Sequence, residues 1–182
     1  MNTTKRIVTA ALLAAFTCIA TMIIKIPTPT FGYIHLGDGL VLLCGFIMGP
    51  VQGALAAGIG SMFADIFSGY ASWAPATLII KAVTALIAGL LFRKLKTPRQ
   101  ASVVIGGLVG EAFMVFGYFA YEVFLAVASA GEFTSSTFAA GIAASATGVP
   151  FNIVQGLTGI VISVILLPIL SKISDIKELI QA

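Results

Sequence analysis

The clearest shortage in this sequence is of charge. Of its 182 residues, 9% are charged and 59% are hydrophobic, and the mean hydropathy is +1.08. Soluble domains carry about 25% charged residues, so this composition excludes an ordinary soluble protein and indicates an integral membrane protein. The sequence also lacks a Pro/Ser-rich linker, a repeat of fixed period and a low-complexity tract. We therefore expect a single membrane domain over residues 1–182.

Cysteine is scarce too. Cys18 and Cys44 both lie in apolar stretches, a pattern that gives neither a disulfide framework nor the spacing of a metal site. The net charge of +3 comes from basic residues beside apolar segments, so membrane orientation explains it better than nucleic-acid binding. Lys5-Arg6 before an apolar run resembles a signal peptide, but the run is long and further apolar segments follow. We expect a retained first helix.

Nucleotide-binding and hydrolase motifs are also missing. The sequence contains no G-x-x-x-x-G-K-[ST], no H-E-x-x-H and no G-x-S-x-G. These absences predict a chain without catalytic residues and without a cofactor of its own. Any energy that drives its activity must therefore come from elsewhere.

Six apolar segments are present, measured against the ~20 residues that a membrane helix needs. Residues 40–64 could form one helix, but Gly49-Pro50 interrupts them, and proline disfavours helix in the residue before it. Basic loops belong in the cytoplasm, and only this division puts Lys5 and Arg93 on one side. We predict an all-α protein with six transmembrane helices and cytoplasmic termini. Its spans are roughly 6–24, 36–49, 51–67, 75–92, 102–127 and 148–170.

The three external segments are then about 25–35, 68–74 and 128–147. They are rich in proline, glycine, serine and threonine, which favour turns and irregular backbone. Loops of this kind can cover a binding site and move.

Polar side chains gather in the outer layer of the predicted bundle, where ionisable groups facing lipid would be costly. Tyr118 and Glu122 share a helical face, as do Asn152 and Gln155. An amide pair, a lysine and aromatic rings suit a polar solute with a ring. We predict that the substrate site contains Trp73, Lys81, Tyr118, Glu122, Asn152, Gln155, His35 and Asp38.

Each of these residues also has a structural interpretation. Asp38 and Asp65 could cap helices or hold ion pairs, and Lys81 could snorkel to the surface or pair with Asp65. Asn152 and Gln155 could bond neighbouring helices. The remaining structural roles are a loop position for His35, an aromatic-belt anchor for Trp73, an interfacial position for Glu122 and a buried acid for Glu111.

Small residues repeat at four-residue spacing in the first span, as Ala10/Ala14 and Ala11/Ala15. Such spacing lets helices approach closely. The stripe could serve packing within this protein or a groove for a partner's helix.

Several segments together resemble the substrate-binding S component of energy-coupling factor (ECF) vitamin transporters. They are Gly-Tyr-Ile-His-Leu-Gly-Asp (32–38), Gly-Phe-Ile-Met-Gly-Pro-Val-Gln-Gly (45–53), Ala-Asp-Ile-Phe-Ser-Gly (64–69), Trp73-Ala-Pro75 and Lys81. The six-span layout extends the resemblance over nearly the whole chain.

The resemblance implies a multi-pass protein of the bacterial plasma membrane that binds a water-soluble vitamin or precursor. It implies that Ala10 and Ala14, or Ala11 and Ala15, dock on a transmembrane coupling (T) subunit, which is carried by two ATPase subunits that use ATP. It also implies an outward pocket and uptake by toppling of the subunit within the bilayer. Neither an enzyme activity nor nucleic-acid binding is expected.

The residues fit more than one ligand. Pyridoxine or hydroxymethylpyrimidine fits the aromatic and amide side chains, Lys81 would suit a carboxylate as in pantothenate, and riboflavin is a further candidate. Two other functions stay open at this point: a stand-alone ion-coupled transporter using Asp65, Glu111 or Glu122, and an intramembrane enzyme using His35, Asp38 and Asp65.

Overall fold

The protein is described by a computed structural model that covers residues 2–30 and 32–181. In chain order its elements are α1 (Thr3–Ile23), β1 (Lys25–Pro27), β2 (Tyr33–His35), α2 (Asp38–Met48), α3 (Pro50–Phe67), α4 (Ala74–Lys94), α5 (Arg99–Ala130), α6 (Ser135–Ala146), α7 (Val149–Leu170) and α8 (Ser174–Gln181). The structure is mostly helical, and the two three-residue strands are its departure from the all-α prediction.

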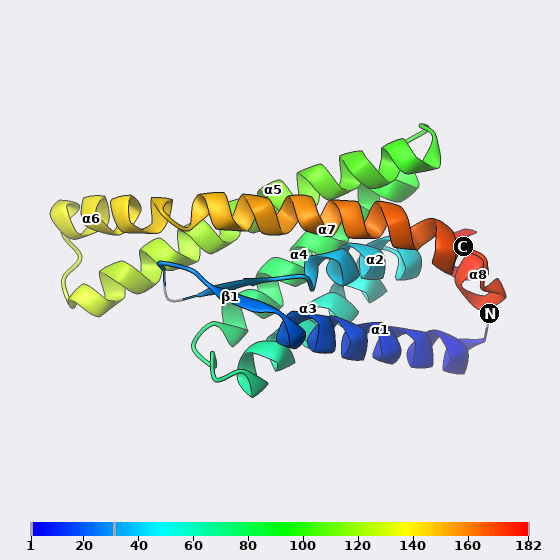
Figure 1. Ribbon diagram of the computed structural model, residues 1–182, viewed down its shortest axis with the longest axis horizontal. Helices are drawn as coiled ribbons and strands as arrows, with labels where there is room; N and C mark the ends of the chain where they lie inside the picture. The colour runs from blue at the N-terminus through cyan, green and yellow to red at the C-terminus, as the bar shows by residue number, and fades with distance from the viewer. Residues whose placement is uncertain (1, 31, 182) are drawn as a thin grey trace.

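The helices form a bundle in which α2 is the central element. Figure 1 shows both chain ends at one end of the bundle and α6 at the opposite end. Helix α2 contacts α1, α3, α4, α7 and α8, and every residue of it except Leu40 is buried. Its apolar side chains therefore form the middle of the main hydrophobic core.

The turn between α2 and α3 divides the predicted 40–64 stretch at the expected place. Helix α2 ends at Met48, Gly49 has φ +82°, and Pro50 is the first residue of α3. Proline is favoured at that position because its missing N–H would have no helical partner. A Cβ on Gly49 would meet the guanidinium of Arg93, so this turn lies at the same end of the bundle as the end of α4. The predicted division is confirmed.

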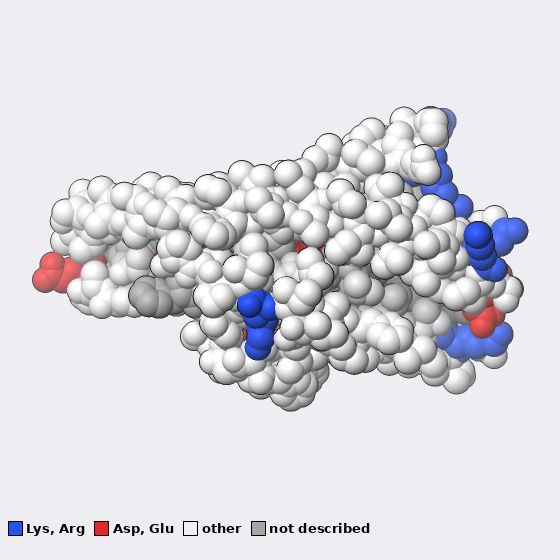
Figure 2. All heavy atoms as spheres, in the orientation of Figure 1, with Lys and Arg blue, Asp and Glu red and all other residues white. Residues whose placement is uncertain are grey.

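Within residues 2–30 and 32–181, four helices are long and apolar enough to cross a membrane: α1, α4, α5 and α7. Helix α2, with 11 residues, is a shorter apolar helix. Figure 2 shows basic side chains gathered at the end that holds the chain termini, with a largely uncharged surface along the bundle. Large apolar side chains are exposed on that surface, among them Ile7, Phe16, Leu55, Phe116 and Val161, as expected of a surface in contact with lipid.

The prediction of irregular backbone over 128–147 is wrong. Helix α5 continues to Ala130 and α6 occupies Ser135–Ala146. The threonines that suggested turns instead form a capping box, because Thr134 and Thr137 each bond the other's backbone N–H. The following alanine-rich residues favour helix. Helix α8, a short amphipathic segment that places Leu179 and Ile180 against the bundle, was not predicted.

Candidate functional site

A β-hairpin covers one side of the bundle between α1 and α2. Strands β1 and β2 pair antiparallel, with Lys25 opposite His35 and Pro27 opposite Tyr33. Proline is tolerated in β1 because an edge strand leaves its nitrogen without a ladder partner. The hairpin is tied to α7, since the backbone N–H of His35 donates to Oε1 of Gln155 at 2.9 Å. This bond fixes the end of β2 on α7.

A polar pocket lies beneath this hairpin. Its volume is about 20 Å³, enough for little more than one water molecule. It is bounded by the hairpin, the end of α3, the residue before α4, and the facing sides of α4, α5 and α7. The lining residues are Thr28, Gly32, Tyr33, His35, Asp65, Trp73, Thr77, Tyr118, Glu122, Asn152 and Gln155.

The structure brings six of the eight predicted site residues to this pocket: Trp73, Tyr118, Glu122, Asn152, Gln155 and His35. Asp38 and Lys81 are not among its lining residues. Five lining residues were not predicted: Thr28, Gly32, Tyr33, Asp65 and Thr77. Thr77 lies four residues before Lys81, on the same helical face, and that spacing could have found it.

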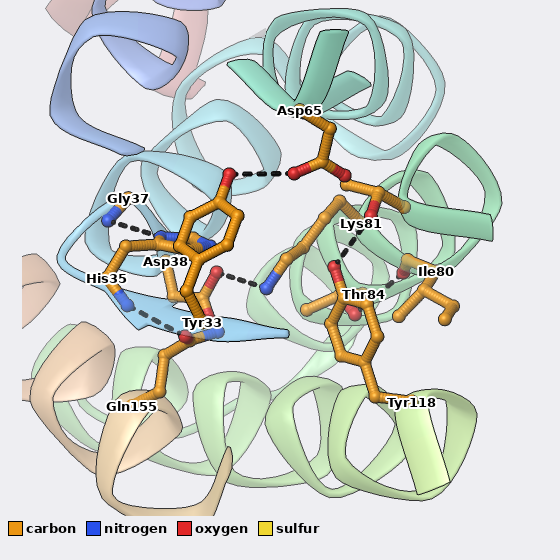
Figure 3. Close-up of polar contacts among 11 residues, drawn as sticks. Tyr33, His35, Gly37, Asp38, Asp65, Ile80, Lys81, Thr84, Tyr118 and Gln155 are labelled. Carbon is orange, nitrogen blue, oxygen red and sulfur yellow. Dashed lines mark hydrogen bonds and ion pairs between the residues drawn. The ribbon is translucent and has the colours of Figure 1, made fainter. Parts of the chain in front are cut away.

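Lys81 and Asp38 form an ion pair one layer below the pocket. Lys81 Nζ donates to Oδ1 of Asp38 at 2.5 Å, and both side chains are fully buried. Figure 3 shows the two side chains directed at each other from α4 and from the start of α2. The Lys81 ammonium also lies 5.0 Å from the centroid of the Tyr118 ring, within range of a cation–π interaction. The lysine charge is thus neutralised inside the bundle.

Gln155 connects the ion pair to the hairpin. Its Nε2 donates to Oδ2 of Asp38 at 2.7 Å, while its Oε1 accepts from His35. Both ends of the side-chain amide are therefore used within the protein (Figure 3). Asn152, one turn earlier on α7, is buried and lines the same pocket, but makes no hydrogen bond through its side chain to any described residue.

His35 is held as a neutral imidazole. Burial lowers its pKa to about 3, although the nearby Asp38 carboxylate acts in the opposite direction. Its Nδ1 accepts a hydrogen bond of 3.0 Å from the backbone N–H of Gly37, so the proton of the neutral ring is on Nε2. A ring this difficult to protonate offers a hydrogen-bond donor to the pocket, rather than acid–base chemistry near neutral pH.

Aromatic side chains form the walls of the pocket. Tyr33 donates to Oδ1 of Asp65 at 2.7 Å, and burial with the adjacent carboxylate raises the pKa of Tyr33 above its usual value. Tyr118 donates to the hydroxyl of Thr77 at 3.2 Å. Trp73 is 8% exposed and packs against Tyr118 and Tyr121, with ring centroids 6.2 and 5.5 Å away. These contacts give the pocket flat apolar faces beside its polar groups.

Glu122 closes the pocket on the α5 side. Thr30 of the segment between the strands donates to its Oε1 at 3.0 Å. The carboxylate is buried, and its Oε2 has no hydrogen-bond partner among the described residues. Glu111, deeper in α5, is also buried, with no described partner for either oxygen, and it does not line this pocket.

The predicted docking residues lie along a groove between α1 and α3. Ala10 and Ala14 are half-buried, whereas Ala11 and Ala15 are exposed. A Cβ on Gly60 would clash with the backbone of Ala14, so part of the small-residue stripe serves the packing of α1 on α3. The groove itself is wide and apolar, and all four alanines line it together with Leu55, Ile59 and Phe63.

Comparisons with known proteins identify the family. The family model described as "ECF-type riboflavin transporter, S component" matches residues 1–172. An "Uncharacterized protein in gap 3'region" of Pyrococcus woesei is 37% identical over 101 residues, which are 55% of this chain and 66% of that protein. The chain thus spans slightly less than two thirds of that relative's length.

A solved structure supports the same conclusion for the fold. The protein of "Structure and mechanism of the S component of a bacterial ECF transporter" matches with a TM-score of 0.73 at 21% identity, covering 94% of this chain and 98% of that one. The family consists of membrane transport subunits rather than enzymes, which removes the intramembrane-enzyme interpretation. From the match over residues 1–172, this chain belongs to the ECF-type riboflavin transporter S component family.

Proposed function

We propose that this chain is the membrane-embedded subunit that captures a water-soluble vitamin for an ECF importer of the cell membrane. The observation that carries the proposal is a family match over almost the whole chain, joined to a polar pocket built from residues of β2, α3, α4, α5 and α7 and of the connections before β2 and α4. Among the vitamins, the family description favours riboflavin over pyridoxine, hydroxymethylpyrimidine or pantothenate.

The chemistry of the pocket agrees with a neutral ring that carries several hydrogen-bonding groups. Trp73 and Tyr118 offer flat faces, and the Asn152 amide offers a donor and an acceptor. Lys81 does not contribute its charge here, because Asp38 neutralises it. A carboxylate ligand such as pantothenate therefore loses the cation that the sequence had suggested for it.

Binding requires the pocket to open. A cavity of about 20 Å³ is far smaller than the 300–1,000 Å³ of typical ligand pockets. The hairpin and the 68–73 connection are the segments that separate the pocket from the exterior. Their displacement around Trp73 is the movement that would admit a vitamin, and such loop closure over a ligand is common.

We further propose six spans with both termini in the cytoplasm. In this arrangement α2 and α3 each cross once, in opposite directions, and Gly49 joins them. Basic residues then lie inside, at the end where Figure 2 shows them gathered. Helix α5 is 32 residues long, about 48 Å at 1.5 Å per residue, so it extends well beyond a hydrocarbon core of about 30 Å.

The proposed partners are a transmembrane coupling subunit and two ATPase subunits, which would use the ATP. The groove between α1 and α3, with its exposed Ala11 and Ala15, is the proposed docking face. Toppling of the subunit in the bilayer would then carry the ligand inward, and the uncharged flanks of the bundle suit such a rotation because few charges would meet lipid.

One experiment tests the function directly. The purified protein is analysed by mass spectrometry for a copurified small molecule, and riboflavin binding is measured by quenching of flavin fluorescence. The protein is then reconstituted in liposomes with and without its coupling and ATPase subunits. We expect uptake only with ATP and the partners. Uptake driven by an ion gradient in their absence would instead support the stand-alone transporter.

A further inference from the structure

Glu122 lies on the boundary between two cavities. One is the inner pocket described above, and the other is an outer cavity of about 470 Å³ between the 29–30 segment, the start of the 72–73 connection, α5 and α6. Of the residues that the structure describes, Trp73 and Glu122 line both. The outer cavity falls in the size range of small-molecule sites, and Leu125, Ala126 and Ala144 give it apolar walls. A ring has room there, and not in the inner pocket.

The carboxylate of Glu122 presents an unused acceptor at this boundary. Thr30 occupies Oε1, while Oε2 has no partner among the described residues, although the side chain is only 7% exposed. Buried polar groups are nearly always hydrogen-bonded, so such an atom calls for a missing partner. A Cβ on Gly148 would lie 2.8 Å from Oε2. That distance is too short for a Cβ, so the glycine before α7 allows the backbone to approach Oε2 closely without donating to it.

The charge around the two cavities has one sign. Asp65 supplies a second carboxylate to the inner pocket, and no lysine or arginine among the described residues lines either cavity. The nearest buried cation, Lys81, is already paired with Asp38. An anionic solute would meet carboxylates with no compensating cation, which is unfavourable in a site of low dielectric constant.

We propose that Glu122 determines specificity in this site by accepting a hydrogen bond from the solute. The solute places its ring in the outer cavity beside Trp73 and presents a hydroxyl, an N–H or a cationic amine to Oε2 of Glu122. Solutes that carry a carboxylate or a phosphate near this point are rejected. The inference rests on the proposed function, because it takes this region to be the substrate site.

Binding of two ligand series tests the inference. Riboflavin is compared with riboflavin 5′-phosphate, and pyridoxine and pyridoxamine are compared with 4-pyridoxic acid, so that charge changes on a constant ring. For the series that binds, we expect the wild-type protein to prefer the neutral or cationic member about tenfold or more over the anion, as expected for one charge-assisted hydrogen bond.

Variants of Glu122 separate the effect of its hydrogen-bond acceptor from the effect of its negative charge. Glu122→Gln keeps the shape and removes the charge, so the best ligand should bind about tenfold more weakly and the neutral-to-anion ratio should shrink. Glu122→Asp withdraws the acceptor but keeps the charge, so affinity should fall while the anion is still rejected. Glu132→Gln, at an exposed position outside both cavities, is the matched control and should change neither value.

The outcomes distinguish this inference from the proposed function. If the wild-type protein binds none of the five compounds, riboflavin and pyridoxine are both wrong as ligands and the inference fails with them. If it binds a series but accepts the anion equally well, only the inference is overturned. The same holds if Glu122→Gln folds and binds with unchanged affinity and selectivity. Should Glu122→Gln fail to fold, the inference is still tested by the neutral-to-anion binding ratio of the wild type and by the affinity of Glu122→Asp.

Discussion

Lys81 on α4 and Asp38 at the start of α2 form a fully buried ion pair, with Nζ 2.5 Å from Oδ1. The sequence had offered Asp65 as a structural partner for this lysine, whereas Asp65 accepts from Tyr33. The pair joins two helices of the core and holds Gln155 beside it. The pair therefore holds α2, α4 and the Gln155 side chain together beneath the pocket.

Removing one partner of this pair should be strongly destabilising. Lys81→Met leaves the Asp38 carboxylate buried without its cation, and the expected loss is about 3–5 kcal/mol. The double variant Lys81→Met/Asp38→Leu should recover much of that stability, because no uncompensated charge remains. Thermal unfolding in detergent measures both, with Lys94→Met, at an exposed position, as the control. A single variant as stable as the wild type would contradict the structural role.

Asn152 and Gln155 should respond differently to substitution, although they are one turn apart on α7. Gln155→Ala breaks bonds to His35 and Asp38, so it should lower stability by about 1–3 kcal/mol as well as weaken ligand binding. Asn152→Ala breaks no side-chain hydrogen bond to a described residue, so it should weaken binding with little loss of stability. Thermal unfolding and equilibrium ligand binding on both variants make the comparison. If the two variants lost the same stability and the same affinity, Asn152 and Gln155 would not have the different roles predicted here.

Stability should depend on pH through His35. Its pKa is about 3 in the folded protein and about 6.5 when unfolded, so the unfolded chain binds the proton more readily. The contribution of the neutral ring is fully present above about pH 6.5 and decreases as the pH falls toward 3, by about 2 kcal/mol between pH 7 and pH 5.

The variant His35→Gln isolates this effect. It should show a flatter stability profile over that range than the wild type, because glutamine does not titrate. Unfolding measured at several pH values in one buffer series provides the comparison. Parallel profiles for the two proteins would mean that His35 is not held in the neutral form.

Trp73 should report ligand binding directly. It is the one tryptophan of the chain, and it lines the pocket. A flavin bound beside it should quench its fluorescence, and titration should give the same dissociation constant as quenching of the flavin itself. Trp73→Phe keeps an aromatic face but has no tryptophan fluorescence, so loss of the fluorescence change in this variant shows that the change comes from Trp73. Saturable binding without any change in tryptophan fluorescence would place the ligand elsewhere.

Much of the fold could be predicted because the membrane imposes simple rules on a sequence. Length, hydropathy and the distribution of lysine and arginine predicted helices where the structure has α1 to α5 and α7, and proline chemistry located the break at Gly49-Pro50. Helix α6 was missed because Ser135, Ser136 and Thr137 are turn formers that also cap helices. The choice between these two roles depends on the residues that follow.

The site was predicted in part, for a different reason. Depth along a helix and helical periodicity brought Trp73, Tyr118, Glu122, Asn152 and Gln155 to one region, and all five line the pocket. These rules do not say which polar groups pair with one another. Lys81 and Asp38 lie at suitable depths, yet they satisfy each other below the pocket, and pairing of this kind depends on the rotation of α2 against α4.

The docking prediction can now be made specific to one face of α1. Ala15 is exposed and lines the groove, whereas Ala14 is half-buried and its backbone lies close to Gly60 of α3. Ala15→Trp should therefore block association with the coupling subunit while leaving stability and vitamin affinity within about twofold of the wild type, because added bulk at a helix interface prevents close approach. Ala14→Trp should also disturb the α1–α3 contact and lower stability. Copurification with the coupling subunit measures docking, and ligand binding measures whether the vitamin site is intact in each variant. A stable complex that still contains Ala15→Trp would move the docking surface away from this groove.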